Sequence, residues 1–241
     1  MKLVIENLKK KFDKKEVLKE INFEFEEGKI YGLLGRNGAG KTTMFNCLNE
    51  DLDIDDGQFY ILDEKKRPIS PQDIGYVLST PVVPEFLTGR EFLKFFIDIN
   101  KKHISDLKSI SKYFNLVRLS EEDQDKLMKD YSHGMKNKMQ LLVHIIASPK
   151  IILLDEPLTS FDVIVAEEMK NLLKNIKKDH ILIFSTHIME LALDLCDEIV
   201  ILNNGILEHV TKSDLNNEEL KRKIIDILKE DENAKWFSGI L

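Results

Sequence analysis

The segment from Gly35 to Thr42 constrains the fold more than any other part of this 241-residue chain. It fits the pattern G-x-x-x-x-G-K-[ST] and directly follows the apolar run Ile30 to Leu34. In such a loop the glycines let backbone N–H groups turn inward around a phosphate, and the lysine adds a compact positive charge. We therefore expect a strand, a phosphate-binding loop and a helix continuing from Thr43 to Leu48, whose N-terminus faces the anion. A glycine-rich turn that fits by accident is the alternative, and the flanking strand and helix patterns argue against it.

This loop supplies most of the predicted ligands of a nucleoside triphosphate. We expect Lys41 to contact the β- and γ-phosphates and Thr42 to contribute a hydroxyl to Mg²⁺. The backbone of the neighbouring residues is expected to surround the phosphate chain. The predicted ligands from this segment are Gly35, Asn37, Gly38, Ala39, Gly40, Lys41, Thr42 and Thr43.

Composition argues against several other classes of protein. With 43% hydrophobic and 32% charged residues, the chain can bury a full core as one large domain or as a core with an inserted subdomain. A formal net charge of -7 argues against nucleic acid as a partner. Cys47 and Cys196 are too few for a disulfide framework and fit a reducing cytoplasm. We see no signal peptide, and no apolar run reaches the roughly 18 to 20 residues of a membrane helix, so work at a membrane would require a partner.

Hydrophobic patterns divide the first part of the chain into sheet and helix. Alternating apolar residues predict antiparallel strands near 3–8 and 21–25, and further short strands at 57–61 and 74–78. From about Thr88 to Ser148 the spacing becomes helical, and Ser120 to Asp123 is a candidate capping box. The pattern therefore indicates a helical insertion.

Sheet-forming runs return in the second part of the chain. They cover 151–156 and 181–187 and flank a predicted helix at 163–177, which is typical of a parallel βα core. Residues 198–210, with Asn203-Asn204-Gly205 as the turn, read as a closing hairpin. The tail from Asn216, with Leu220, Ile224, Ile227 and Leu228 as its apolar residues, predicts one amphipathic helix packed on the body.

An acidic pair at the end of an apolar strand is the second chemical feature. Asp155 is placed to hold Mg²⁺ through water, and Glu156 to orient and deprotonate an attacking water. Two acids that begin a solvated turn are the common alternative. Together with the phosphate-binding loop, however, the pair supplies the minimal set of groups that Mg²⁺-dependent phosphoryl transfer requires.

A third segment, Tyr131-Ser132-His133-Gly134-Met135, lies before a predicted helix. With the loop at 35–42, Asp155-Glu156-Pro157, Asp162 and His187, it resembles the motifs of the ATP-binding subunits of ABC transporters, in the same order and with similar spacing over nearly the whole chain. The resemblance implies an α/β fold, with a P-loop NTPase core of mainly parallel sheet, an N-terminal antiparallel β subdomain and an inserted α-helical subdomain.

Domain boundaries follow from the resemblance and the patterns together. We expect a single ABC-type ATP-binding domain over residues 1–241. The ATPase core with its β subdomain is expected at approximately 1–78 and 149–212. The helical subdomain is expected at 79–148 and a C-terminal helical tail at 213–241.

The residues 131–135, called here the signature segment, can also be interpreted from their chemistry alone. Ser132 offers a hydroxyl and the N–H groups around Gly134 open a helix, so the segment is a second candidate anion site; an ordinary helix cap is the alternative. The resemblance implies that these residues close over the γ-phosphate of a second subunit. The expected assembly is a head-to-tail homodimer, or a heterodimer with a related ATPase subunit, with two ATP molecules at the interface.

Further roles are carried over from the family one residue at a time. Phe12 stands where the family stacks an aromatic ring on adenine, although alone it reads as a core residue. His187 is implied to reach the γ-phosphate, and alone reads as a surface or capping residue. Asp162 is implied to line the dimer interface, and it could also cap the next helix. Lys41, Glu156 and His187 are thus the expected catalytic residues.

Some positions depart from the family pattern. Ser79 stands where the family usually has a glutamine, and a serine hydroxyl is too short to span from Mg²⁺ to the attacking water in the same way. We expect Thr42, Asp155 and Ser79 around the metal, with a water filling the gap at Ser79. His133 and Met135 replace the usual glycine and glutamine. Because Ser132, Gly134, Glu156 and His187 are retained, we still expect hydrolysis.

The predicted function is therefore an ATP-binding and ATP-hydrolysing subunit that drives a separate integral-membrane permease from the cytoplasmic face of the cell membrane. ATP and Mg²⁺ are the expected cofactors. The segment Pro81 to Phe86 either docks on the permease or forms a turn with its apolar residues tucked inward. Tyr131-Ser132 and Met135 look closest to exporters of drugs, peptides or polymers. The rival functions are a soluble ABC-type ATPase that serves assembly or regulation without transport, and an ATP-binding switch with negligible turnover.

Overall fold

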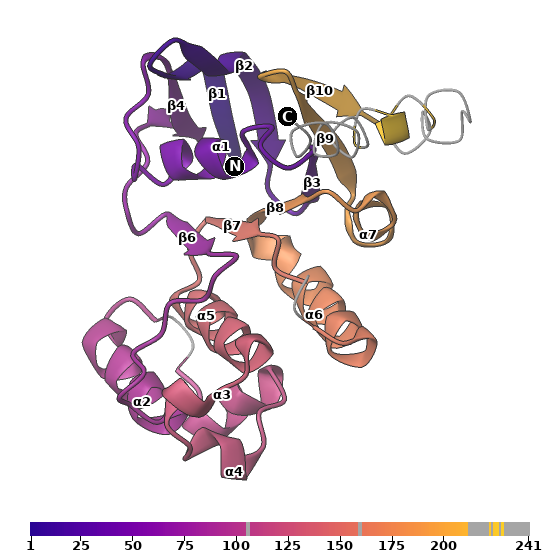
Figure 1. The fold of residues 1–241 in the computed structure, drawn as a ribbon. Helices are drawn as coiled ribbons and strands as arrows, with labels where there is room; N and C mark the ends of the chain where they lie inside the picture. The colour runs from indigo at the N-terminus through magenta and orange to yellow at the C-terminus, as the bar shows by residue number, and fades with distance from the viewer. Residues whose placement is uncertain (105–106, 159–160, 212–221, 223, 227, 229–241) are drawn as a thin grey trace.

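The structure is a computed structural model, which describes residues 1–104, 107–158, 161–211, 222, 224–226 and 228. Its strands and helices form two sheets and two groups of helices (Figure 1). The strands are β1 Lys2–Phe12, β2 Lys15–Glu26, β3 Ile30–Leu34, β4 Asp56–Leu62, β5 Lys66–Arg67, β6 Ile74–Val77, β7 Ile151–Asp155, β8 Ile181–Thr186, β9 Glu198–Asn203 and β10 Ile206–Val210. The helices are α1 Lys41–Leu48, α2 Gly89–Asn100, α3 Ile110–Leu116, α4 Glu121–Gln124, α5 His133–Ala147, α6 Val163–Ile176 and α7 Met189–Leu195, with short 3-10 helices η1 Met128–Asp130 and η2 Lys177–Asp179.

The central sheet has six strands in the order β10-β9-β3-β8-β7-β6. Pairing is parallel from β9 through β6, and β10 adds an antiparallel edge. β3, β7 and β8 are buried along their whole length, which explains why their sequences are continuous apolar runs rather than alternating ones. The predicted parallel core is confirmed, and its carboxyl edge carries the ends of β3, β6, β7 and β8.

A second, antiparallel sheet has the order β2-β1-β4-β5. Its inner face packs with α1 against one face of the central sheet in a single hydrophobic cluster that includes Leu3, Phe25, Phe45, Leu153 and Ile183. α6 and α7 cover the opposite face, where Leu154, Phe184 and Leu173 are buried together. Alternate residues of β7 thus serve opposite layers, and α1 lies inside the molecule between the two sheets (Figure 1).

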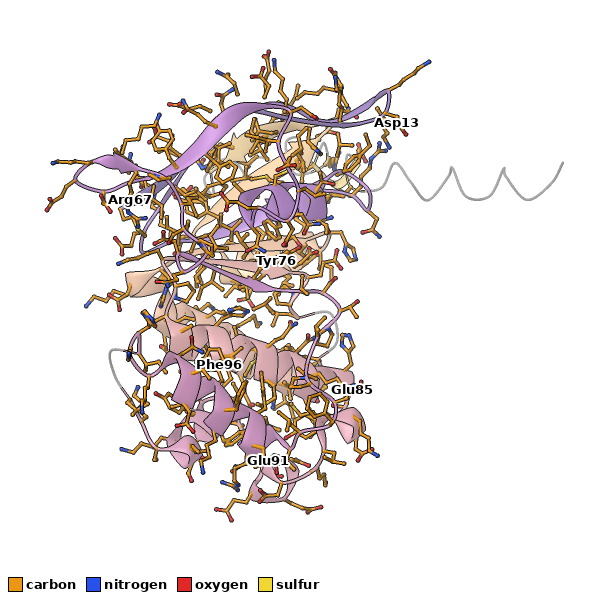
Figure 2. All side chains as sticks on the ribbon, turned by 90° about the vertical axis from the view of Figure 1, so that its left-hand side faces the viewer. Asp13, Arg67, Tyr76, Glu85, Glu91 and Phe96 are labelled. Atoms are coloured by element: carbon orange, nitrogen blue, oxygen red, sulfur yellow. The ribbon has the colours of Figure 1, made fainter. Side chains whose placement is uncertain are left out.

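The helical group α2 to α5 lies beside the sheets and has its own core, which includes Leu93, Phe114, Met139 and Leu142. It is inserted between β6 and β7, as the helical pattern from 88 to 148 predicted. Thr88 begins α2 with a reciprocal capping box to Glu91. In Figure 2 the β1–β2 turn at Asp13 and the start of α2 at Glu91 lie at opposite ends of the molecule.

The closing hairpin has the predicted turn. Asn204 and Gly205 have φ values of 49° and 81°, as a two-residue type I′ turn requires, and Asn203 pairs with Ile206. Of the predicted tail, the described residues are helical, and Ile224 is buried against the cluster under α6 and α7. Leu220 and Ile227 lie outside the described residues. Among the residues that the structure describes, no helix is both long and apolar enough to cross a membrane.

Candidate functional site

A pocket of about 470 Å³ opens at the carboxyl edge of the central sheet. It gathers residues from the β1–β2 turn, the loop before α1, the end of β6 and the end of β7. Its lining residues are Phe12, Lys15, Val17, Asn37, Gly38, Gly40, Lys41, Thr42, Thr43, Ser79, Asp155 and Glu156. Every one of these except Lys15 and Val17 was predicted from the sequence to bind nucleotide or metal or to act in catalysis.

The loop before α1 owes its shape to its glycines. Gly38 and Gly40 have φ values of 80° and 109°, a backbone region that L side chains rarely adopt. A Cβ on Gly40 would also lie 2.9 Å from Cγ1 of Val17. Gly40 is the N-cap of α1, and no described side chain caps that helix. The first N–H groups of α1 therefore face the pocket as donors for an anion.

Lys41, the first residue of α1, is buried at the floor of the pocket. Its Nζ donates to the carbonyls of Gly35 at 2.7 Å and Arg36 at 3.1 Å, and lies 4.0 Å from Oε1 of Glu156. Burial lowers the pKa of Lys41, while the charges of Glu156 and Asp155 oppose that shift. The ammonium group is thus held inside a low-dielectric site in which a bound anion would interact strongly with it.

Thr42 and Asp155 bring two oxygen donors together. Oγ1 of Thr42 donates to Oδ2 of Asp155 at 2.8 Å, although the two residues come from α1 and β7. Hydroxyl and carboxylate oxygens are the ligands that Mg²⁺ prefers. The described residues contain no group of three or more His, Cys, Asp or Glu side chains that could hold a metal ion. This donor set fits a Mg²⁺ ion bound by one or two protein oxygens and by substrate phosphates.

Glu156 follows β7 with a φ of 47°, a left-handed conformation that is uncommon for a residue with a side chain. Its Oε1 lies 3.0 Å from Nδ1 of His187, at the end of β8. The carboxylate therefore lies between Lys41 and His187 at the mouth of the phosphate pocket. A base in this place has Lys41 on one side and His187 on the other.

Phe12 and Ser79 lie at the ends of the pocket. Phe12 is 45% exposed, so the interpretation of Phe12 as a core residue is wrong. Nζ of Lys10 lies 5.4 Å from the centroid of the Phe12 ring. An exposed ring at the rim of a pocket is free to stack on a flat ligand. Ser79 follows β6 and lines the pocket on the side of the helical group.

Three predicted residues adjoin the pocket without lining it: Gly35 and Ala39 belong to the loop before α1, and His187 contacts Glu156. Three others lie away from the pocket, at the starts of α5 and α6. Ser132 is the N-cap of α5 and accepts a hydrogen bond from the N–H of Met135 at 3.2 Å, and Gly134 lies in the first turn of the same helix. Asp162 caps α6 by accepting from the N–H of Val165 at 2.9 Å. The structure thus brings one half of the predicted site together in one pocket and leaves the other half on separate helix starts.

Sequence reasoning missed Ser185, which is fully buried on β8. Its Oγ donates to Oδ1 of Asp155 and accepts the N–H of Glu156 at 3.0 Å. A signal was available, because Ser185 is a polar residue that interrupts an apolar strand two positions before His187. Lys15 and Val17, which line the pocket beside Phe12, were also missed, and nothing in their sequence context distinguishes them.

Fold and pocket together define a nucleotide-binding protein with a phosphate-binding loop. A family model described as "ABC transporter" matches residues 18–159, more than half of the chain. The chain belongs to the ABC transporter family and carries its ATP-binding domain.

Similar proteins of known sequence agree with this assignment. An uncharacterized ABC transporter ATP-binding protein of Methanocaldococcus jannaschii is 35% identical over 215 residues, which cover 88% of this chain and 78% of that protein. The uncharacterized ABC transporter ATP-binding protein YdbJ of Bacillus subtilis is 29% identical over 242 residues, which cover 98% of this chain and 78% of YdbJ.

Solved structures establish the same fold. An ATP-binding subunit of an ABC transporter superposes with a TM-score of 0.78 at 22% identity, covering 95% of this chain and 99% of that one. A dimeric ATP-binding cassette in a post-hydrolysis state, bound to ADP and Pi, gives a TM-score of 0.73 at 22% identity and covers 87% of this chain and 98% of that one. The predicted ABC-type α/β fold is therefore confirmed.

Proposed function

We propose that this chain is the Mg²⁺-dependent ATP-hydrolysing subunit of a transporter, and that ATP-driven dimerisation couples it to a separate membrane permease. The observation that carries the proposal is the pocket in which Lys41, Thr42, Asp155 and Glu156 converge, with His187 in contact with Glu156. A phosphate-binding loop, a metal-binding oxygen pair and a carboxylate base are the parts that phosphoryl transfer to water requires.

Binding of ATP follows from the positions of the lining residues. Phe12 stacks on the base, and the N–H groups of the loop and of α1 surround the phosphates, from Gly35 through Thr43. Lys41 exchanges its carbonyl partners for the β- and γ-phosphates. When bound, Mg²⁺ would neutralise part of the phosphate charge; Thr42 and Asp155 would hold it, with Ser79 contributing through a water.

Hydrolysis requires a base at the γ-phosphate. Glu156 accepts a proton from the attacking water, and its contact with His187 at 3.0 Å holds the carboxylate in place. His187 also reaches the γ-phosphate through its other ring nitrogen. Lys41 balances the charge that develops on the transferred group.

The second half of the site comes from another subunit. Ser132, Gly134 and Asp162 lie at helix starts outside the pocket, where they are available to a neighbouring chain. We propose a head-to-tail homodimer, or a heterodimer with a related ATPase, in which α5 of each subunit closes over the ATP of the other. The solved dimeric ATP-binding cassette bound to ADP and Pi is a precedent at the level of fold.

The permease contact is proposed at the helical subdomain, which we delimit at 79–148. In the segment Pro81 to Phe86, Val82 is 70% and Phe86 79% exposed, whereas Val83 packs against the helical core. Elsewhere on the helical subdomain, at the C-terminal end of α2, a groove of about 550 Å³ is lined by Phe96, Ile99 and His103, among others. The exposed apolar side chains favour docking over an inward-tucked turn.

One ion pair links this segment to the signature helix. Oε1 of Glu85 lies 2.8 Å from Nζ of Lys136, one turn beyond Ser132 on α5. Movement of a docked permease would thus reach the helix that covers the partner's ATP. The subunit would act at the cytoplasmic face of the membrane, and Tyr131-Ser132 with Met135 favours an exporter.

Glu156→Gln tests the base and the shared site together. The amide keeps size and hydrogen bonding but cannot accept the proton, so ATP should bind and remain uncleaved. Two copies should then stay joined, and size-exclusion chromatography with ATP should show a dimer. Adding Ser132→Arg should return the protein to a monomer, because the bulk blocks the anion pocket over the partner's nucleotide. Hydrolysis by Glu156→Gln at the parental rate would exclude Glu156 as the base.

A pull-down distinguishes transport from the rival functions. The full chain, expressed in its own host and solubilised from membranes, should co-purify with an integral-membrane subunit, and Phe86→Asp should weaken that association. Recovery with water-soluble partners alone would instead favour an assembly or regulatory ATPase. ATP binding without measurable turnover would favour a switch.

A further inference from the structure

Ser185 is a polar side chain at a position where the fold expects an apolar one. It lies on β8, a strand buried along its whole length, and the side chain is fully inaccessible to solvent. In the parallel pairing of β7 with β8, Ser185 is the register partner of Asp155. A hydroxyl in such a place must be hydrogen-bonded to be tolerated, and this one is.

The hydrogen bonds of this hydroxyl are of fixed direction. A serine hydroxyl has one donor and two acceptor lone pairs. Its O–H donates to Oδ1 of Asp155, and its lone pair accepts the N–H of Glu156 at 3.0 Å. Since a backbone N–H can only donate, the hydroxyl proton is directed to the carboxylate. Ser185 therefore contacts two successive functional residues at once.

Each contact constrains one functional group. Because Oδ1 of Asp155 accepts from Ser185, the carboxylate is rotated so that Oδ2 faces Thr42, at 2.8 Å from its hydroxyl. The N–H of Glu156 belongs to a residue with a φ of 47°, a conformation that persists only where the surroundings determine it. Anchoring that N–H sets the direction in which the Glu156 side chain leaves the strand, toward His187 and Lys41.

We infer that Ser185 is a positioning residue for ATP hydrolysis, which fixes the metal-binding carboxylate of Asp155 and the base Glu156 in one geometry through a single hydroxyl. This inference rests on the proposed ATPase function. Ser185 touches neither the pocket nor the substrate, since it is absent from the pocket lining and fully buried. Its effect should therefore appear in turnover rather than in nucleotide affinity.

The test compares Ser185→Ala with a matched serine. Ser120 makes the same pair of bonds: its Oγ donates to Oδ2 of Asp123 at 2.6 Å and accepts the N–H of Asp123 at 3.1 Å. It caps α4 in the helical group, away from the pocket. Ser120→Ala thus removes a hydroxyl that makes the same two kinds of hydrogen bond at an exposed position, and it controls for the loss of such a pair outside the site.

With the purified full chain, ATP affinity and single-turnover hydrolysis are measured for each variant. Ser185→Ala should lower the rate of hydrolysis by about thirtyfold and change the Kd for ATP by less than about threefold. Ser120→Ala should match the parent in both. Ser185→Thr keeps the hydroxyl and should recover the rate to within about threefold. If its extra methyl prevents folding, Ser185→Cys replaces it, and as a weak donor of similar size it should remain as slow as Ser185→Ala.

A coupling measurement separates positioning from loss of structure. If Ser185 acts largely through Glu156, then adding Ser185→Ala to Glu156→Gln should lower the residual rate by less than about threefold. Full activity of folded Ser185→Ala or Ser185→Cys would overturn the inference. A parallel loss of ATP affinity and rate would overturn it as well, because it would indicate a structural role. A parent chain that neither binds nor hydrolyses ATP would instead refute the proposed function.

Discussion

Two helix starts in this protein have opposite designs. α1 begins after Gly40, with no described side chain capping it, and its first residue Lys41 is buried in the pocket. α5 begins after Ser132, whose exposed hydroxyl already accepts the N–H of Met135. The first helix leaves its N-terminal donors to a ligand, whereas the second satisfies one of them itself.

The difference shows which half of the site is complete within one chain. The α1 site has its charge, its oxygen donors and its base in mutual contact. The start of α5 is capped by the exposed Ser132, so it is stable at the surface without a ligand. A capped helix start is stable before a partner's phosphate binds to it. An uncapped start has N–H groups that are satisfied only when a ligand binds.

The largest effect should come from Lys41. Lys41→Ala removes the buried ammonium and its charge-assisted hydrogen bonds to phosphate, each worth about 1.5–3 kcal/mol. We expect ATP affinity to fall about a thousandfold, or ~4 kcal/mol. Ser132→Ala should leave the ATP affinity of the isolated chain within about twofold of the parent, because α5 does not contribute to its own pocket. Fluorescence titration with a labelled ATP measures both.

Equal losses of ATP affinity in Lys41→Ala and Ser132→Ala would contradict the proposed difference between the two helix starts. They would mean that Ser132 contacts the nucleotide of its own chain. Unchanged affinity in a folded Lys41→Ala protein would refute the assignment of the phosphate-binding loop.

The second effect concerns the contact between the helical group and the central sheet, where α5 meets β6. Nε2 of His144, on α5, is 3.1 Å from the carbonyl of Tyr76 on β6, and burial lowers the pKa of His144 from 6.5 to about 4. A histidine that burial keeps neutral lowers the free energy of unfolding as soon as the unfolded state can bind a proton that the folded state does not. Stability contributed by His144 is therefore complete above pH 6.5 and lost progressively as the pH falls to about 4, by ~3 kcal/mol.

Urea unfolding of the parent and of His144→Gln at pH 7, 5.5 and 4 measures this loss. Glutamine can keep the hydrogen bond to Tyr76 but does not titrate. The difference in unfolding free energy between the two proteins should shrink or reverse as the pH falls. A pH-independent difference would show that His144 is protonated without penalty in the folded protein.

The smallest effect is expected at Ser79, where β6 leads from the core to the helical subdomain. Ser79→Gln brings a longer oxygen ligand toward the metal, so Mg²⁺ affinity or turnover should rise a few-fold, less than about 1 kcal/mol. Titration of ATPase activity with Mg²⁺ gives both quantities. A fall in both, with the fold intact, would show that the site has adapted to serine. Thr80→Gln is the control for the added bulk.

Much of the fold could be predicted from local patterns. The apolar runs at 151–155 and 181–186 are strands because a parallel strand is covered on both faces. The closing hairpin follows from Asn204-Gly205, which is suited to a turn with two positive φ values. Strand order was beyond such reasoning, since pairing of β3 with both β8 and β9 depends on contacts across the whole chain.

The site, too, has residues that local sequence patterns predict and residues that depend on long-range contacts. Asn37, Gly38 and Gly40 of the loop before α1 line the pocket because the spacing of the loop determines its local shape. Ser185 escaped prediction because its role depends on register between two strands that are distant in sequence. The exposure of Val82 and Phe86 was likewise open, because an apolar residue in a turn can point either way.

The order of the central sheet also has a consequence for synthesis of the protein. Ile30 of β3 pairs with Leu182 of β8, and Tyr31 pairs with Glu198 of β9. On the ribosome, β3 therefore remains without either neighbour until β8, at Ile181–Thr186, has emerged, a delay on the order of ten seconds. During that time its apolar face and unpaired edges are exposed to chaperones and to other nascent chains. β1 and β2 can pair at once, so the N-terminal ribbon should form long before the phosphate-binding loop acquires its final shape.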